Sequence, residues 1–343
     1  MRHEPGGRGN RTLVLRPTRL AAFALLAVLV FTGCAGAPST LDPHGPGASR
    51  VAGLWWFLFI VSAVVCVVFI ALVVFGAMRR QKNREIPEHD ASTPRWARNL
   101  VIGGGVVFPV LILSVLWVMT LHDMAALSAP TRPARLTVQV EGYQWWWRVS
   151  YPGQGIVTAN EIHVPTGQPV RVVLTTNDVN HSFWVPQLVG KTDLIAGRTT
   201  SLWLQADNAG VYRGQCAEYC GLQHANMAFY VVAQSPADFR AWASNEAAAA
   251  PATDPAGQSV FENAPCAACH TIRGTTAHGT FGPDLTHFGS RMTIGAGTVP
   301  NNRGYLGGWI VNAQSIKPGS LMPPIQLSAA DEQQLIDYLE SLK

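Results

Sequence analysis

The stretch Cys216-Ala217-Glu218-Tyr219-Cys220-Gly221-Leu222-Gln223-His224-Ala225-Asn226-Met227 carries the most specific chemistry in this sequence. Thiolate, imidazole and thioether ligands together favour copper, whereas a zinc site more often uses Cys and His without Met. A disulfide between Cys216 and Cys220 is the alternative, but it would leave His224 and Met227 unexplained. We therefore predict a copper site in this segment.

A second histidine ligand must come from elsewhere in the chain, and His181 is the candidate. It stands in Asn180-His181-Ser182-Phe183-Trp184-Val185-Pro186, where a strand gives way to a loop. A lone histidine at such a place is more often structural. Beside the cysteine-rich loop, however, a distant histidine from another strand is what a metal site in a β-sandwich requires.

The segment 130–246 has the pattern of a small β domain. Leu136, Val138 and Val140 alternate with polar residues, the period of a half-buried strand. Gly, Pro, Asn and Asp separate further predicted strands at 161–164, 170–176, 199–205 and 227–233. Several short strands in one segment indicate a β-sandwich or a Greek-key barrel.

A second cofactor motif is Cys266-Ala267-Ala268-Cys269-His270. This C-x-x-C-H spacing attaches a c-type haem, with Cys266 and Cys269 as thioethers and His270 as an axial iron ligand. A redox dithiol would not need the histidine.

The other axial ligand must lie downstream, and Met322 in Gly319-Ser320-Leu321-Met322-Pro323-Pro324 is the main candidate. Methionine ligation raises the reduction potential and suits an electron relay. Met292 is a lesser option, and His278 or His287 would be able to replace a methionine.

Residues 256–343, which follow an Ala/Pro-rich linker at 247–255, have helical character. Ser328 with Asp331 resembles a capping box at a helix start. We expect Phe261 and Tyr338 to pack the first and last helices together. The last helix carries an apolar stripe at helical spacing, formed by Leu335, Ile336, Leu339 and Leu342.

Two uncharged runs, 51–78 and 100–121, are long enough for transmembrane helices, which need about 20 apolar residues. Only 13% of the residues are charged and 48% are hydrophobic, in line with membrane segments. Six Lys and Arg residues in the intervening loop 79–99 predict that it is cytoplasmic, so everything after 121 lies outside. Pro109 is expected to kink the second span.

Residues 1–34 have the pattern of an export signal, with an arginine-rich start and a short apolar run. Phe31-Thr32-Gly33-Cys34 resembles a bacterial lipobox, which would make Cys34 a lipidation site; cleavage near Ala35-Gly36-Ala37 and a retained anchor are the alternatives. The formal net charge is +4, and the extramembrane part has no basic run that indicates a nucleic-acid partner.

With these motifs in this order, the chain resembles subunit II of the haem-copper cytochrome c oxidases, in the caa3-type form with a fused C-terminal cytochrome c domain. The resemblance covers nearly the whole chain. It implies a multi-domain membrane protein with a two-helix transmembrane hairpin, an all-β cupredoxin-like Greek-key domain and an all-α class I cytochrome c domain.

The resemblance also implies a dinuclear CuA centre. Cys216 and Cys220 would bridge both coppers, His181 and Met227 would complete one copper, and His224 with the carbonyl oxygen of Glu218 would complete the other. The Glu218 carboxylate would reach a magnesium ion shared with subunit I.

Outside the ligand set, Trp145 in Gln144-Trp145-Trp146-Trp147 would be the electron entry point. Trp146 departs from the family, where Tyr is commoner. Asp178 and Lys191-Thr192-Asp193 also match, and would serve either docking or a water or proton path, or be plain surface charge.

The implied function is electron entry into an oxidoreductase and translocase, in aerobic respiration with proton translocation. Electrons from cytochrome c or another donor would enter at haem c and pass through CuA to the oxygen-reducing site of subunit I. The chain would not be catalytic alone. Its partners would be subunits I and III and lipid, in the bacterial cell (inner) membrane, with both cofactor domains extracytoplasmic.

Two other protein classes are alternatives, and two more are disfavoured. A nitric oxide reductase with a CuA-bearing subunit of similar build is the closest rival, and a stand-alone membrane-tethered copper and haem carrier is another. Quinol oxidase subunits II lack the copper ligands that stand here, and the two spans disfavour nitrous oxide reductase.

Overall fold

A computed structural model describes residues 38–82, 94–130, 132–251 and 254–343. The expected export signal and Cys34 lie outside the described residues, as does most of the loop between the two spans.

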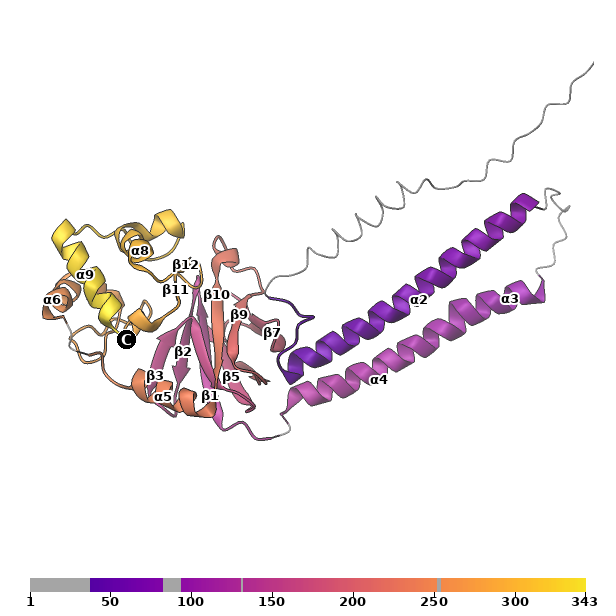
Figure 1. The fold of residues 1–343 in the computed structure, drawn as a ribbon, viewed down its shortest axis with the longest axis horizontal. Helices are drawn as coiled ribbons and strands as arrows, with labels where there is room; N and C mark the ends of the chain where they lie inside the picture. Colours follow the sequence, from indigo (N-terminus) through magenta and orange to yellow (C-terminus); the bar gives the residue numbers. More distant parts are fainter. Residues whose placement is uncertain (1–37, 83–93, 131, 252–253) are drawn as a thin grey trace, which may run out of the picture. The chain divides into compact units, whose positions relative to one another are not determined.

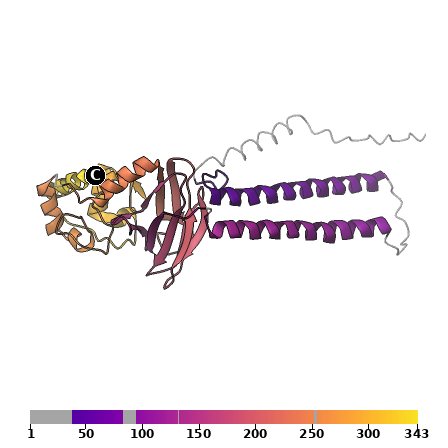
Figure 2. The same ribbon diagram turned by 90° about the horizontal axis from the view of Figure 1, so that it is seen from below.

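Two helical rods contain the predicted spans, and Figures 1 and 2 both show them side by side. The first is α2 (Pro46–Lys82). The second runs through α3 (Arg95–Ile102), the π-helical η1 (Gly103–Val107) and α4 (Phe108–Ser128). Both are long and apolar enough to cross a membrane. The π-helical segment ends two residues before Pro109, which lies in the first turn of α4, and the kink expected at Pro109 stays a prediction.

The β domain consists of two five-stranded sheets. In the first, the order is β3-β2-β1-β5-β8, formed by β1 (Leu136–Tyr143), β2 (Trp146–Tyr151), β3 (Ile156–Ala159), β5 (Val170–Thr176) and β8 (Thr200–Leu204). In the second, the order is β4-β10-β9-β6-β7, formed by β4 (Glu161–Pro165), β6 (His181–Val185), β7 (Val189–Leu194), β9 (Gly210–Cys216) and β10 (Ala228–Gln234). The four strands predicted with bounds match β4, β5, β8 and β10 within one residue at each end, and the predicted alternation from Leu136 to Val140 lies in β1.

Alternating side chains from both sheets form one core. Along β1, for example, Val138 and Val140 are buried while their neighbours face outward. At the centre, Trp147 packs edge-on against Phe183 and Phe229, with ring centroids 6.3 and 5.2 Å away. The core extends to the predicted metal ligands, because the Trp147 ring lies 6.0 Å from the ring of His181. Close packing makes such a core rigid.

The C-terminal domain is mainly helical, and α5 (Pro236–Ala247) precedes it. It contains α6 (Pro255–Asn263), α7 (Cys266–Cys269), η3 (Phe288–Ser290), α8 (Arg303–Ile316) and α9 (Ala329–Ser341). A short hairpin interrupts the helices. Its strands, β11 (Thr293–Ile294) and β12 (Val299–Pro300), have two residues each, and the sequence did not predict them.

Three predictions for this domain are confirmed, one of a helix cap and two of packing. The Ser328 hydroxyl accepts a hydrogen bond from the Asp331 N–H at the start of α9. The rings of Phe261 and Tyr338 lie 6.3 Å apart and join α6 to α9. The predicted apolar stripe of α9 is buried in the domain core.

Candidate metal and haem centre

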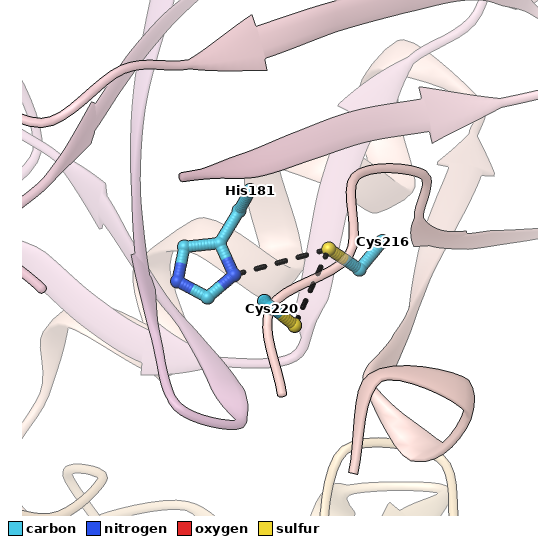
Figure 3. Close-up of side chains that lie close together, drawn as sticks. All are labelled: His181, Cys216 and Cys220. Carbon is cyan, nitrogen blue, oxygen red and sulfur yellow. Dashed lines mark hydrogen bonds between the residues drawn. The ribbon is translucent and has the colours of Figure 1, made fainter. Parts of the chain in front are cut away.

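The pairing of β6 with β9 brings the distant histidine to the cysteines. Phe183 lies opposite Cys216, and the Ala217 N–H donates to the Ser182 carbonyl, so the start of β6 reaches the end of β9. The Cys216 sulfur then lies 3.8 Å from Nδ1 of His181 and 3.8 Å from the Cys220 sulfur (Figure 3). These three buried side chains form a group able to hold a metal ion.

The loop after β9 gathers the remaining predicted ligands. A hydrogen bond of 2.9 Å from the Cys216 N–H to the Met227 carbonyl closes it at its base. The Cys220 sulfur lies 3.6 Å from Nδ1 of His224 and 3.7 Å from the Met227 sulfur. The Glu218 carbonyl oxygen lies 3.2 Å from the Cys216 sulfur. All six predicted copper positions are therefore within one cluster, and both cysteines are free rather than joined in a disulfide.

Electrostatics favour one thiolate in this cluster. Hydrogen bonding from the Cys220 thiol, together with His181, lowers the pKa of Cys216 well below its usual range. As the donor in that contact, Cys220 has a raised pKa. Burial lowers the pKa of His181, but the Cys216 sulfur and Asp178 outweigh it and raise the pKa overall. Because the thiolate is the form that binds metals, the cluster is prepared for a cation.

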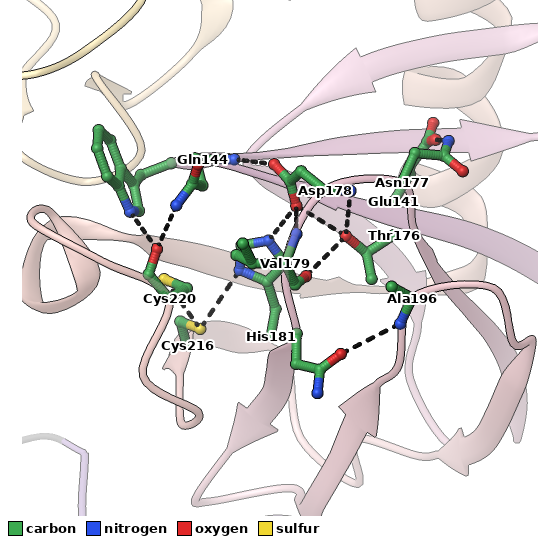
Figure 4. Close-up of polar contacts among 12 residues, drawn as sticks. Glu141, Gln144, Thr176, Asn177, Asp178, Val179, His181, Ala196, Cys216 and Cys220 are labelled. Atoms are coloured by element: carbon green, nitrogen blue, oxygen red, sulfur yellow. Dashed lines mark hydrogen bonds and ion pairs between the residues drawn. The ribbon is translucent and has the colours of Figure 1, made fainter.

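Asp178, whose role the sequence left open, holds the His181 ring. Its carboxylate lies 2.9 Å from Nε2 of His181 and accepts a 2.7 Å hydrogen bond from the Gln144 N–H (Figure 4). The Thr176 hydroxyl and the Val179 N–H also donate to it. Engaging Nε2 in this way leaves Nδ1 directed at the sulfurs, the arrangement by which an outer partner orients a metal-binding histidine.

Two glycines that sequence reasoning missed make room for the site. A Cβ on Gly142 of β1 would lie 2.8 Å from Cδ2 of His181, so only glycine lets β1 pass beside the ring. Gly221 has φ +112, a conformation that side chains rarely adopt, and lies against Trp145. The sequence signal was present in Glu141-Gly142-Tyr143 and Cys220-Gly221, but only the fold shows what each glycine approaches.

The three adjacent tryptophans have separate environments. Trp147 is in the core, and Trp146 stacks on Tyr143 with ring centroids 4.9 Å apart. The indole Nε1 of Trp145 donates a 2.9 Å hydrogen bond to the Cys220 carbonyl, which also accepts from the Gln144 side chain. Trp145 is therefore bonded directly to the loop that carries the candidate copper ligands.

In the C-terminal domain, one hydrogen bond orients the ring of His270, the predicted iron ligand. Its Nδ1 lies 2.8 Å from the Pro283 carbonyl, which can only accept, so Nδ1 carries the proton and Nε2 has a free lone pair. Burial lowers the pKa of His270 and keeps the ring neutral. Cys266 and Cys269, on the single turn of α7, are both free.

The four candidates for the second axial ligand differ in exposure and in hydrogen bonding. Met322 is half-buried, and its carbonyl accepts from the Gln314 side chain. Met292 is exposed, and its N–H donates to Glu161 of the β domain. His278 is exposed, whereas buried His287 lies with Nε2 3.2 Å from the Ala248 carbonyl. His287 is thus already engaged.

Comparison with known proteins agrees with both domains. The family model "Cytochrome C oxidase subunit II, periplasmic domain" matches residues 154–234, and the model "Cytochrome c" matches 255–343. Cytochrome c oxidase subunit 2 of Alkalihalophilus pseudofirmus is 35% identical over 92% of this chain and 94% of its own length. The Bacillus sp. PS3 protein of the same name is 32% identical over 94% and 96%.

Other matches cover a smaller share of the chain. Quinol oxidase subunit 2 of Bacillus subtilis is 32% identical but covers only 66% of this chain. The solved periplasmic domain of oxidase subunit II from Bradyrhizobium japonicum is 31% identical over 34% of this chain and 95% of its own, with a TM-score of 0.33. Both of these cytochrome c oxidase subunits 2 match along nearly the full length, and the chain belongs to the cytochrome c oxidase subunit II family, in the form that carries a fused cytochrome c domain.

Proposed function

We propose that the chain takes electrons from a cytochrome c donor at a covalently attached haem and relays them through a dinuclear CuA centre to subunit I. The observation that carries the proposal is the convergence of six donor atoms in one cluster: five come from residues 216–227, and the sixth is the imidazole of His181 at the start of β6. When bound, the copper pair and the haem supply reversible one-electron chemistry. The protein residues supply ligands, orientation and exclusion of water.

The copper ligands divide between a fixed strand end and a loop. Cys216 and Cys220 would bridge the two ions, with His181 and Met227 on one and His224 and the Glu218 carbonyl on the other. The donor set fits copper, because it combines soft sulfur with imidazole. Glu218 itself is exposed, so its carboxylate is free to reach a magnesium ion shared with subunit I.

The haem ligands would come from α7 and the loop before α9. Cys266 and Cys269 would form the thioethers, Nε2 of His270 would bind the iron, and Met322 would complete the coordination. Phe281 and Leu321 are 86% and 88% exposed, unusual for large apolar side chains of a folded domain. A large apolar cofactor nearby would account for that exposure.

The membrane part supports assembly with other subunits. The described parts of both spanning helices keep apolar side chains facing outward along their length. We propose that lipid and subunits I and III cover these surfaces in the bacterial inner membrane. Near the outer ends of the helices, Arg50 and Asp123 form an ion pair of 2.9 Å that fixes the hairpin.

The test is a count of copper and haem in the purified full-length chain, with electron spin resonance of the copper. We expect two coppers with a mixed-valence spectrum and one haem per chain. Cys216→Ser or Cys220→Ser should abolish that spectrum and leave haem incorporation intact, while Cys66→Ser in the first span serves as the matched control. One bound zinc, or a cystine bridge without copper, would refute the proposal.

A further inference from the structure

The β domain and the cytochrome domain meet along a hydrogen-bonded contact, which we call the seam. It consists of direct contacts across the domain boundary rather than a flexible tether. The donor and acceptor pairs are Gln223 to the Pro318 carbonyl at 2.8 Å, the Ala228 N–H to the Ala296 carbonyl at 2.9 Å, the Met292 N–H to Glu161 at 2.7 Å, and Arg148 to the Thr280 carbonyl.

Lys317, directly after α8, lies at the centre of the seam. Its Nζ donates to the carbonyls of Trp145 at 2.8 Å, Asn226 at 2.6 Å and Gly295 at 2.7 Å. Two of these acceptors belong to the β domain and one to the cytochrome domain. An ammonium group has three donors and a neutral amine only two, so this geometry uses the charged form completely.

Such a lysine is costly to retain. The residue is 2% exposed, and the described contacts include no carboxylate that would pair with it. Burial lowers the pKa of Lys317 to about 7. A buried unpaired charge is unfavourable unless its hydrogen bonds are satisfied, and an apolar side chain would fill the space more cheaply. The three carbonyl contacts therefore indicate a specific role.

Close to Lys317, the loop that carries Met322 lies against the Trp145 indole. Two residues further on, Gly319 has φ +85, and a Cβ there would lie 3.5 Å from the Trp145 indole and 3.0 Å from the Leu222 side chain. Gly319 opens the loop that carries Met322, while the same indole is bonded to the Cys220 carbonyl. Lys317 also holds the main chain of Trp145 through its carbonyl. The Met322 loop, the Trp145 indole and the copper loop are therefore fixed to one another.

We propose that Lys317 is a positioning residue for electron transfer within the chain, holding the Met322 loop of the cytochrome domain against Trp145 beside the copper loop. The inference rests on the proposed function and adds to it a fixed, docked cytochrome domain. With both centres bound, the relay would move one electron from the haem to the copper pair, and it would need no other reactant.

The test compares Lys317→Met with Arg303→Met in the full-length chain. Methionine keeps the apolar stem and removes all three donors. Arg303 is an exposed cation of the same domain, paired with Asp337 and Glu340 rather than with the seam, so its replacement controls for loss of charge. Should the methionine variant not retain haem, Lys317→Gln, which keeps an amide donor, is judged by the same criteria.

Two measurements are needed. Hydrogen exchange of the Ala228 and Met292 amides, which donate across the seam, reports docking and requires no bound metal. The rate of haem-to-copper electron transfer after photoreduction reports function, with the haem absorbance and copper resonance spectra as checks on each centre.

Lys317→Met removes three hydrogen bonds from a charged donor, so we expect both amides to exchange at least about tenfold faster, the factor that one such bond represents. We expect electron transfer to slow by a similar factor, because the Met322 loop would be docked against Trp145 for a smaller fraction of the time. Both spectra should stay unchanged. Unchanged exchange and rate, or faster exchange with an unchanged rate, would overturn the positioning role. If the unmodified chain holds both centres and no electron passes between them, the proposed function fails instead.

Discussion

The copper loop and the haem segment differ in how much of each site the polypeptide holds in place by itself. Around the copper loop, His181, Cys216, Cys220 and Met227 are all buried, and their donor atoms are already in mutual contact. In the haem segment only His270 is fully oriented, through its bond to the Pro283 carbonyl.

The cause of the difference is the scaffold. Paired strands and outer hydrogen bonds position the proposed copper ligands, and the loop that carries four of the six is closed on itself. The proposed haem ligands would come from the turn of α7, the residue after it and a proline-rich loop, and the large apolar side chains of Phe281 and Leu321 remain exposed there. A site built on strands is preorganised, whereas a site built around a large cofactor needs that cofactor to complete its core.

The largest expected effect comes from removing the haem, which tests whether the cytochrome domain is less preorganised than the copper loop. Replacing both Cys266 and Cys269 by alanine removes covalent haem, and we expect the cytochrome domain to lose about 4 kcal/mol or more, as for removal of a tightly bound ligand. Hydrogen exchange of the α9 amides measures this loss, and the copper resonance of the same sample should persist. Equal protection of α9 with and without haem would show that the domain is preorganised too.

Next in size is Met322→Ala, which tests the least determined ligand. Loss of the thioether should convert a low-spin haem to a high-spin or differently ligated one, seen in the absorbance and resonance spectra. Met292→Ala is the matched control and should leave the spectrum as it was. An unchanged spectrum in Met322→Ala would assign the ligand to Met292 or to a histidine.

Asp178→Asn probes preorganisation of the copper loop without removing a ligand. The amide is uncharged and accepts more weakly, so the His181 ring loses part of its orientation and basicity. Loss of an outer partner of a metal-binding histidine costs about 10- to 100-fold in metal affinity, which competition with a copper chelator would measure. Asp193→Asn, on the neighbouring strand β7, is the control. Equal affinities would mean that the strands alone position the ring.

Much of this fold was readable from local pattern, and the exceptions have identifiable causes. Strand β1 was predicted because its buried positions are apolar and alternate. Strand β9 was missed because its inward positions include Gly214 and Cys216, and the Phe229 ring occupies the space a side chain would take at Gly214. Strand β2 was missed because three adjacent tryptophans hide its period of two.

At the sites too, local motifs were predictable, whereas roles that depend on contacts between distant segments were not. Motif spacing located the copper and haem segments, because each motif is local in the chain. The function of Asp178 depends on where Gly142 allows the His181 ring to lie, and this is a contact between β1, β6 and the loop before β6. Lys317 in Ile316-Lys317-Pro318 reads as an ordinary surface lysine, and only the meeting of two domains buries it.

The smallest expected effect sharpens the comparison by testing what the cytochrome domain does hold without haem. Ser328→Ala removes the hydroxyl that accepts from the Asp331 N–H, and loss of an N-cap costs about 1 kcal/mol. The cap lies in local chain geometry, so this loss should appear equally in the haem-bearing and haem-free proteins when α9 exchange is measured in both. The matched variant Ser341→Ala, at the other end of α9, removes a hydroxyl that donates to a carbonyl rather than an N-cap and should cost less. An effect of Ser328→Ala confined to the haem-bearing form would mean that α9 itself folds only around the cofactor, and the contrast between the two sites would then extend from side chains to secondary structure.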